Sequence, residues 1–381
     1  MTTGAIDHRR VLLIVSSDYG ELGAALHFLS GLSLAEPALL LIPPKLLHTV
    51  QGLPGLRVQV QQGAADIHSA IDGFRPDTVL LASGYLVALD AKVSIPALFW
   101  LLRRLRRLGA VTLTTDPYLG VRPEPMRQLR TNLRQRKHRD ALLGALALWP
   151  ITRLLADVWH VYPAPLSRLP RLAENPRCRG FRGQATAADR PPLAAGSETP
   201  QWVFVLSALE YRLLAHGHQG RFEALLMARL HDCADAGRKA LLVGPQPLVD
   251  RVRAQWPNAT WLQARCDLGY ADYLQQLMAA EYAFFWNMMS FSTIHRVMAD
   301  LPVFYFDEGH LAHIHPAFWQ AGVRLFYDGW QPPCLDLAEA LDPAALRAGA
   351  AAVRPIMRQL VEGMRRSPSA SELLNALPGV P

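Results

Sequence analysis

The stretch that most constrains the fold of this chain lies at residues 281–310 (EYAFFWNMMSFSTIHRVMADLPVFYFDEGH). It contains two apolar runs of strand length, separated by a polar turn and a short helix, and it ends in an acidic turn. In chain order these units are residues 282–286, 287–293, 294–300, 303–306 and 307–310, with Leu301-Pro302 ending the helix. A strand, a helix and a second strand in this order predict one βαβ step of a parallel sheet.

The polar turn of this step carries three hydroxyl side chains, those of Ser290, Ser292 and Thr293. In a parallel sheet such a turn lies at the carboxyl edge of the strands, where ligands bind. The N–H groups and the dipole at the N-terminus of the helix favour a phosphate at this place. The alternative is that Ser290 only caps the helix and that the other residues serve packing.

Similar units lie on both sides of this stretch. The first half predicts strands at residues 11–16, 38–42, 56–60, 78–82, 111–114 and 158–162, with helices at 24–32, 65–74 and 97–108. The second half predicts strands at residues 202–206, 240–243, 259–262, 282–286, 303–306 and 323–327, with helices at 221–236, 247–255, 270–280 and 292–299. Each alternation predicts an α/β domain with a doubly wound parallel sheet.

The length of 381 residues also favours two domains, because a single core rarely grows past ~250–300 residues. We predict a Rossmann-like N-terminal domain at residues 1–165 and a Rossmann-like C-terminal domain at residues 201–335. Residues 166–200 are predicted to form a linker or crossing segment, since residues 163–200 hold seven prolines and no sustained periodicity. Residues 336–381 are predicted to form C-terminal helices and a tail.

Cysteine and histidine usage argues against a metal site. The cysteines Cys178, Cys233, Cys266 and Cys334 are widely spaced and form no C-x-x-C pair, which disfavours both a zinc site and a disulfide framework. The N-terminal residues lack the apolar region and cleavage site of a signal peptide. We therefore expect a cytoplasmic protein without a metal or another cofactor.

Two such domains, joined by a linker and closed by C-terminal helices, resemble the GT-B fold of nucleotide-sugar glycosyltransferases. In architecture the resemblance covers essentially the whole chain, whereas in motif it is specific only at residues 270–310, which look like the donor site of the family. It implies two domains that face each other across a cleft. The donor-binding residues that it implies are Ser207, Asn287, Ser290, Ser292, Thr293, His295, Asp307, Glu308 and His310.

One position departs from the pattern of the family. Many members carry a glutamate that binds the donor ribose seven residues before the proline, and here His295 stands in that place. Asp307 or Glu308 could supply the ribose carboxylate from the next turn, or the imidazole could face a diphosphate, as in heptosyltransferase-like members. The structural alternative for His295 is a buried histidine beside apolar Val297 and Met298.

The resemblance places the catalytic base in the N-terminal domain, just after its first strand. Asp18 occupies that position, and Asp116, at the end of another strand, is the second candidate. A base would accept the proton of the acceptor, while cationic or N–H groups would stabilise the departing diphosphate without a metal. The structural alternatives are that Asp18 caps the helix behind it and that Asp116 forms a turn with Pro117.

The net charge of +7 is concentrated in one region, because residues 101–140 hold eleven Arg or Lys and three acidic residues. The simplest explanation is a set of solvated helix faces. Nucleic-acid binding is disfavoured by the absence of interleaved aromatic residues and of a recognised motif. Residues 122–155 are basic and then apolar, which is also typical of a peripheral membrane contact at the inner face.

The sequence thus predicts a metal-independent glycosyltransferase that moves a sugar from a nucleotide-activated donor to an acceptor that it does not identify. Two alternatives stay open: a nucleotide-sugar epimerase of the same fold, and a catalytically silent subunit that binds nucleotide or sugar.

Overall fold

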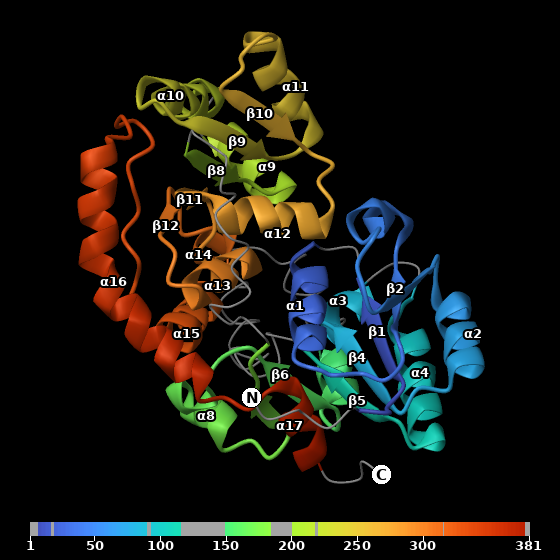
Figure 1. The fold of residues 1–381 in the computed structure, drawn as a ribbon. Helices are drawn as coiled ribbons and strands as arrows, with labels where there is room; N and C mark the ends of the chain where they lie inside the picture. The colour runs from blue at the N-terminus through green and yellow to red at the C-terminus, as the bar shows by residue number, and fades with distance from the viewer. Residues whose placement is uncertain are drawn as a thin grey trace, which may run out of the picture. The chain divides into compact units, whose positions relative to one another are not determined.

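A computed structural model of the chain describes residues 7–16, 19–89, 93–115, 149–183, 200–217, 220–314 and 316–377. The chain divides into two compact units, each built on a parallel sheet (Figure 1). The first unit comprises residues 1–184, 324–328 and 363–381, and the second comprises residues 185–323 and 329–362. Both parallel α/β sheets that the sequence predicts are confirmed.

The first unit contains a seven-stranded, fully parallel sheet with the strand order β3-β2-β1-β4-β5-β6-β7. Its strands are β1 (Val11–Val15), β2 (Ala38–Ile42), β3 (Leu56–Val60), β4 (Thr78–Ala82), β5 (Val111–Thr114), β6 (Trp159–Tyr162) and β7 (Cys178–Gly180). Every residue of β1, β2 and β4 is buried, which explains why their sequences are continuous apolar runs without alternation.

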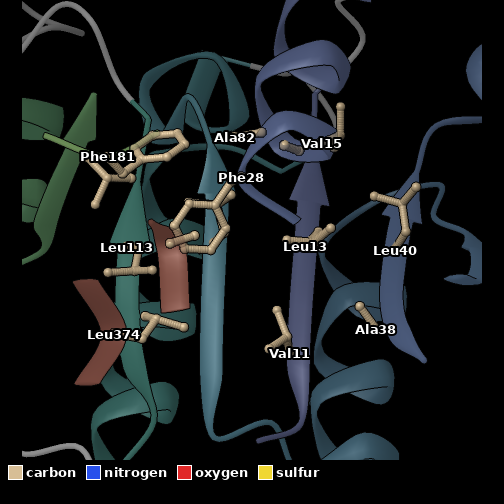
Figure 2. Packing of buried hydrophobic residues seen from close by; sticks show 14 of the residues in the cluster. Val11, Leu13, Val15, Phe28, Ala38, Leu40, Ala82, Leu113, Phe181 and Leu374 are labelled. Carbon is tan, nitrogen blue, oxygen red and sulfur yellow. The ribbon is translucent and has the colours of Figure 1, made fainter. Parts of the chain in front are cut away.

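Helices cover both faces of this sheet. Figure 2 shows one face, where Phe28 of α1 (Tyr19–Ser30) and Leu374 of α17 (Ala370–Ala376) pack against strand residues such as Leu13 and Leu113. On the other face lie α2 (Ala64–Phe74), α3 (Gly84–Leu89), α4 (Ile95–Leu108) and helical residues 149–155. The short helices η1 (Pro44–Thr49), η2 (Leu166–Arg168) and α8 (Pro170–Ala173) also belong to this unit.

The second unit contains a five-stranded parallel sheet with the order β10-β9-β8-β11-β12. The strands are β8 (Gln201–Val205), β9 (Lys239–Val243), β10 (Leu262–Arg265), β11 (Tyr282–Phe285) and β12 (Val303–Tyr305). One face packs on α9 (Ala208–Gly217), α10 (Arg221–Asp235), α11 (Gln246–Gln255) and α16 (Pro343–Arg365). The remaining helices are α12 (Tyr270–Ala279), α13 (Phe291–Met298), α14 (His310–Ile314) and α15 (Pro316–Tyr327).

In each sheet the order in which successive strands are added reverses once. The chain builds outward from β1 through β2 and β3, and then returns to the other side of β1 with β4. In the same way it builds from β8 through β9 and β10, and then returns with β11. Right-handed crossovers put the helices before and after such a reversal on opposite faces, which opens a crevice at the carboxyl ends of the central strands. The expected ligand sites are therefore next to β1/β4 and β8/β11.

Two predicted strands are wrong: one is part of a helix in the structure, and the other begins later in the sequence. Residues 323–327 belong to the helix α15, which begins at Pro316 and ends just before Asp328 and Gly329, which both have positive φ. A short apolar run cannot by itself distinguish a strand from a buried helix segment. The strand predicted at residues 259–262 begins at Leu262, because a turn precedes it in which Trp256 packs on Trp261.

The unit boundaries also differ from the predicted ones. Residues 166–183 contain η2, α8 and β7, and the pairing of β7 with β6 places them in the first unit rather than in a linker. A three-residue strand next to prolines gives too short an apolar run to be recognised. The C-terminal segment is shared, since most of α16 lies in the second unit while α17 packs in the first. Residues 184–199 of the predicted linker lie outside the described residues.

Arg296 fixes α13 within the second unit. Its guanidinium is completely buried and donates hydrogen bonds to the backbone oxygens of Leu277, Ala280, Glu281 and Pro302. The Nη2–oxygen distance to Pro302 is 2.8 Å and the Nη1–oxygen distance to Ala280 is 3.0 Å. One side chain thus ties α13 to the end of α12 and to the starts of β11 and β12.

We predict that Arg296→Met destabilises the protein by roughly 3 kcal/mol or more, because four buried carbonyl groups lose their donor at once. Chemical denaturation measures this change. The matched control is Arg354→Met, since Arg354 is exposed and pairs with Asp300 at the surface, so that its loss should change little. Equal stability of the two variants would contradict the role assigned to Arg296.

Candidate functional site at the carboxyl edge of the second sheet

Three polar residues stand in one row at the edge of the second sheet. Ser207, Asn287 and Asp307 are each the second residue after the end of a strand, namely of β8, β11 and β12. These strands are neighbours, and their last residues share one register, since Phe285 pairs with both Val205 and Tyr305. The three predicted donor-site residues are therefore aligned at the switch point of the sheet.

Glu210, which is not among the predicted site residues, connects these strand ends. It lies in the first turn of α9, with only 5% of its surface exposed. The Asn287 side-chain amide donates to Glu210 Oε1 over 3.0 Å, and His310 Nδ1 lies 2.8 Å from the same oxygen. The Glu210 backbone N–H donates to Ser207 Oγ over 3.2 Å. Ser-x-x-Glu after a predicted strand is the spacing of a capping box, and this signal could have identified Glu210.

His310 begins α14 and has one ring nitrogen engaged by this network. With Nδ1 held by the Glu210 carboxylate, Nε2 is the nitrogen that can meet a ligand. About a fifth of the His310 side chain is exposed (21%), whereas the Glu210 side chain is almost inaccessible (6%). The buried carboxylate therefore orients the imidazole, and the imidazole is the accessible partner.

A close approach of two backbone segments holds Asn287 in place. Asn287 Oδ1 accepts a hydrogen bond from the Met289 N–H over 2.8 Å. Gly309 has φ +97°, and a Cβ added there would lie 2.5 Å from Asn287 Oδ1. The Gly309 N–H donates to Asp307 Oδ1 over 2.8 Å. Glycine is needed here both for its backbone conformation and for the space that Asn287 occupies.

We predict that Gly309→Ala weakens ligand binding at this edge, because the new methyl group displaces Asn287. The control is Gly329→Ala, where φ is +83° but nothing lies within 4 Å of the added Cβ. Both variants should lose about 1 kcal/mol or more of stability through the positive φ. Only Gly309→Ala should weaken binding of a nucleoside diphosphate in calorimetric titration. If both variants bind alike, the contact with Asn287 does not matter for the site.

The two acidic residues of the turn are already engaged. Asp307 accepts from Gly309 and lies 3.4 Å from His313 Nε2, and Glu308 Oε1 accepts a hydrogen bond from Gln331. These carboxylates shape the loop between β12 and α14. A ligand that bound to these carboxylates would have to displace their present partners.

The three hydroxyl groups at the start of α13 differ in their hydrogen bonds. Ser290 is the N-cap by position, but its side chain makes no capping hydrogen bond. Thr293 is buried, and its Oγ1 donates to the Ser290 carbonyl oxygen over 2.8 Å. Ser292 bonds to Tyr273 of α12. Ser290 thus differs from Thr293 and Ser292, because among the described residues its hydroxyl has no capping hydrogen bond.

His295 lies one turn further along α13, against α12. Its Nε2 is 3.3 Å from the Tyr270 hydroxyl oxygen, and its ring packs edge-on against Phe291. Desolvation lowers the pKa of His295 from 6.5 to about 4. The imidazole is therefore neutral near pH 7, and it can offer a hydrogen bond but no positive charge.

The lowered pKa of His295 predicts a pH dependence of stability. The unfolded chain binds a proton at this residue below pH 6.5, whereas the folded chain does so only near pH 4. Stability is therefore lost as the pH falls through this window, by roughly 2–3 kcal/mol in total. Denaturation curves at several pH values should show a shallower acid loss for His295→Gln than for the wild type. Identical slopes would contradict a neutral His295 in the folded protein.

Both candidate catalytic carboxylates, Asp18 and Asp116, lie outside the described residues. The strands that precede them in the sequence are β1, which ends at Val15, and β5, which ends at Thr114. The Ser83 N–H donates to Thr115 Oγ1 over 3.0 Å, and the Gly84 N–H donates to Thr114 Oγ1 over 2.9 Å. These bonds join the ends of β4 and β5 at the carboxyl edge of the first sheet. The helix α1 begins at Tyr19, earlier than the predicted residue 24, so that Asp18 directly precedes it.

Within the described ranges, no group of three or more His, Cys, Asp or Glu side chains could hold a metal ion. Among the described helices, none is both long and apolar enough to cross a membrane.

Comparison with known proteins identifies the fold. No protein-family profile matches the sequence, and no curated protein matches it significantly. Among solved structures, the calicheamicin glycosyltransferase CalG4 is similar over 97% of this chain and 97% of its own, with 13% identity and a TM-score of 0.53. UGT2 of Phytolacca americana, solved with UDP-2-fluoroglucose and pterostilbene, is similar over 96% and 98%, with 12% identity and a TM-score of 0.53.

A third similar structure is named for a different reaction. It is a candidate UDP-N-acetylglucosamine 2-epimerase from Listeria monocytogenes, similar over 96% of this chain and 92% of its own, with 12% identity and a TM-score of 0.50. At these identities the likeness establishes the fold alone. The chain has the two-sheet GT-B fold, as the sequence predicts.

Proposed function

We propose that this protein is a glycosyltransferase that moves a sugar from a nucleotide-activated donor to an acceptor. The observation that carries the proposal is the row of Ser207, Asn287 and Asp307 at the switch point of the second sheet, cross-linked by Glu210 to His310. The GT-B fold supports it, because structures of this fold include glycosyltransferases solved with nucleotide sugars. Fold alone does not decide between reactions, and the site therefore has to be tested.

In this proposal the second unit binds the nucleotide diphosphate of the donor. Three helices, α9, α13 and α14, begin at the edge where β8, β11 and β12 end. The N-terminus of α13 offers N–H groups and the Ser290 hydroxyl to a phosphate, and His310 Nε2 offers a further hydrogen bond. These groups would stabilise the charge of the leaving diphosphate without a metal ion or another cofactor. His295, being neutral, would contribute a hydrogen bond only.

The acceptor would be activated from the first unit. Asp18 and Asp116 follow β1 and β5 in the sequence, and a carboxylate beyond the end of either strand could accept the proton of an acceptor hydroxyl. The reaction would form a bond between the acceptor oxygen and the anomeric carbon while the bond to the diphosphate oxygen breaks. The proton would go to the aspartate.

A panel of nucleoside diphosphates tests the donor site. One of them should bind and, at about a hundred times its Kd, stabilise the fold by about 2.7 kcal/mol. His310→Gln should weaken this binding by ~10-fold or more, because a hydrogen bond to a charged phosphate is lost. The matched control is His313→Gln on the same helix, since the His313 side chain is 70% exposed and lies outside the Glu210 network.

Two results would contradict the donor-site proposal: no diphosphate binds, or both histidine variants bind as the wild type does. Conversion of a sugar nucleotide to an isomer without any acceptor would instead support an epimerase. Tight nucleotide binding without turnover of any sugar nucleotide would support a silent binding subunit.

Substitution of the aspartates tests the base. If Asp18 is the base, Asp18→Asn should lower turnover by ~10²–10⁴-fold and leave nucleotide binding intact. If Asp18 only caps α1, the variant should stay active and lose about 1 kcal/mol of stability. The same comparison for Asp116→Asn decides between the two residues. Near-normal turnover in both variants would place the base elsewhere.

We also propose a cytoplasmic location with peripheral membrane contact through residues 122–155. Residues 122–148 lie outside the described ranges, so that the basic composition of this segment is what supports the contact.

A further inference from the structure

Three aromatic side chains of the first unit are exposed to solvent rather than buried in its core. Phe99 and Trp100 of α4 are 43% and 54% exposed, and Trp149 of the helical residues 149–155 is 53% exposed. The core-facing side of α4 is already complete, because Leu98, Leu101, Leu102 and Leu105 are buried against the sheet. The aromatic residues are therefore not needed for folding.

These aromatic residues come from two helices on the same face of the sheet. Both helices pack into one hydrophobic cluster, through Leu102 of α4 and Ile151 of residues 149–155. Both end at the amino edge of the sheet, where Arg106 pairs with Asp157 over 2.9 Å. Trp100 and Trp149 each lie roughly two turns before the end of their helix, and thus at a similar height.

Arginines that pair with no acidic residue in the described part of the chain accompany the aromatic residues. The Arg103 guanidinium lies 5.4 Å from the Trp100 ring centroid, and that of Arg153 lies 4.5 Å from the Trp149 ring centroid. Within the described part of the chain, no acidic side chain pairs with Arg103, Arg107 or Arg153. The other two arginines of α4 differ, because Arg104 pairs with Asp72 and Arg106 with Asp157.

The α4 sequence contains no acidic residue, and its exposed side also carries Leu108, which is 43% exposed. Exposed tryptophans beside unpaired arginines match the boundary of an anionic bilayer. Tryptophan rings prefer the depth of the lipid headgroups, and basic side chains are attracted by anionic lipids. The exposed side of α4 lacks the amide and hydroxyl side chains that would read nucleic-acid bases.

We propose that α4 and residues 149–155 form a surface, made of Phe99, Trp100, Arg103, Arg107, Trp149 and Arg153, that docks on an anionic lipid bilayer. This inference deepens the membrane contact proposed for residues 122–155 and rests on that part of the proposed function. It is independent of sugar transfer. Docking through this surface would bring the protein to acceptors or donors that are held at a membrane.

Vesicle co-sedimentation of the full-length protein tests this surface. The wild type should bind vesicles that contain phosphatidylserine more strongly than vesicles of phosphatidylcholine alone, and added salt should weaken the binding. Arg103→Glu with Arg107→Glu should weaken it by about 25-fold or more, since each basic residue near an anionic surface strengthens binding roughly five-fold. Trp100→Ser with Trp149→Ser should lower binding to both kinds of vesicle.

Matched controls come from the same unit. Arg57→Glu changes an exposed arginine on β3, and Leu47→Ser changes an exposed apolar residue on η1. Neither should alter vesicle binding. Every variant should bind nucleoside diphosphate as the wild type does, so that a loss of vesicle binding is separable from a failure of the donor site.

Three results would overturn the proposal. The first is that the α4 variants bind vesicles as the controls do. The second is that binding depends only on Arg134, Arg136, Lys137 and Arg139 of residues 122–155, which would leave the wider membrane contact standing and remove α4 from it. The third is that the same variants abolish binding of a single-stranded RNA oligonucleotide while vesicles are not bound at all.

Discussion

The buried guanidinium of Arg296 is the interaction on which the geometry of the candidate site depends most. A charge taken out of water is costly unless its donors are satisfied, and here backbone carbonyl oxygens accept the hydrogen bonds of the guanidinium. Those carbonyls belong to the end of α12 and to the starts of β11 and β12. The position of α13 relative to two strands is thereby fixed, and with it the helix N-terminus that meets the ends of those strands.

The site follows from this framework by register. Because β8, β11 and β12 are parallel neighbours with aligned ends, residues two positions beyond each strand have to lie in a row. Glu210 then links this row to α14, since one buried carboxylate oxygen contacts both the Asn287 amide and the His310 imidazole. A buried carboxylate with two donors is well satisfied and orients both partners, which suits the diphosphate site that we propose at this edge.

Much of this could be predicted from the sequence, because continuous apolar runs identify strands that are buried on both faces. Strands such as β2 and β4 have the predicted bounds. Ser207, Asn287 and Asp307 were among the residues predicted to bind the donor, and that role stays a prediction. Glu210 was missed because its role needs three segments that are far apart in the sequence to meet. The segment 323–327 was mistaken for a strand, since its apolar run has no period that separates a strand from a helix. The low pKa of His295 depends on desolvation in the folded chain, which no local pattern reveals.

Hydrogen exchange measured by mass spectrometry, with and without the nucleoside diphosphate that binds best, tests the central claim most directly. The central claim is that the diphosphate binds at the carboxyl edge of β8, β11 and β12. Exchange should slow in the peptides that cover residues 287–293 and 307–314, and in the first turn of α9 around Glu210. The carboxyl edge of the first sheet, around Ser83 and Thr115, should be unchanged by the nucleotide alone. Protection confined to the first unit, with no change at residues 287–293 or 307–314, would contradict the account.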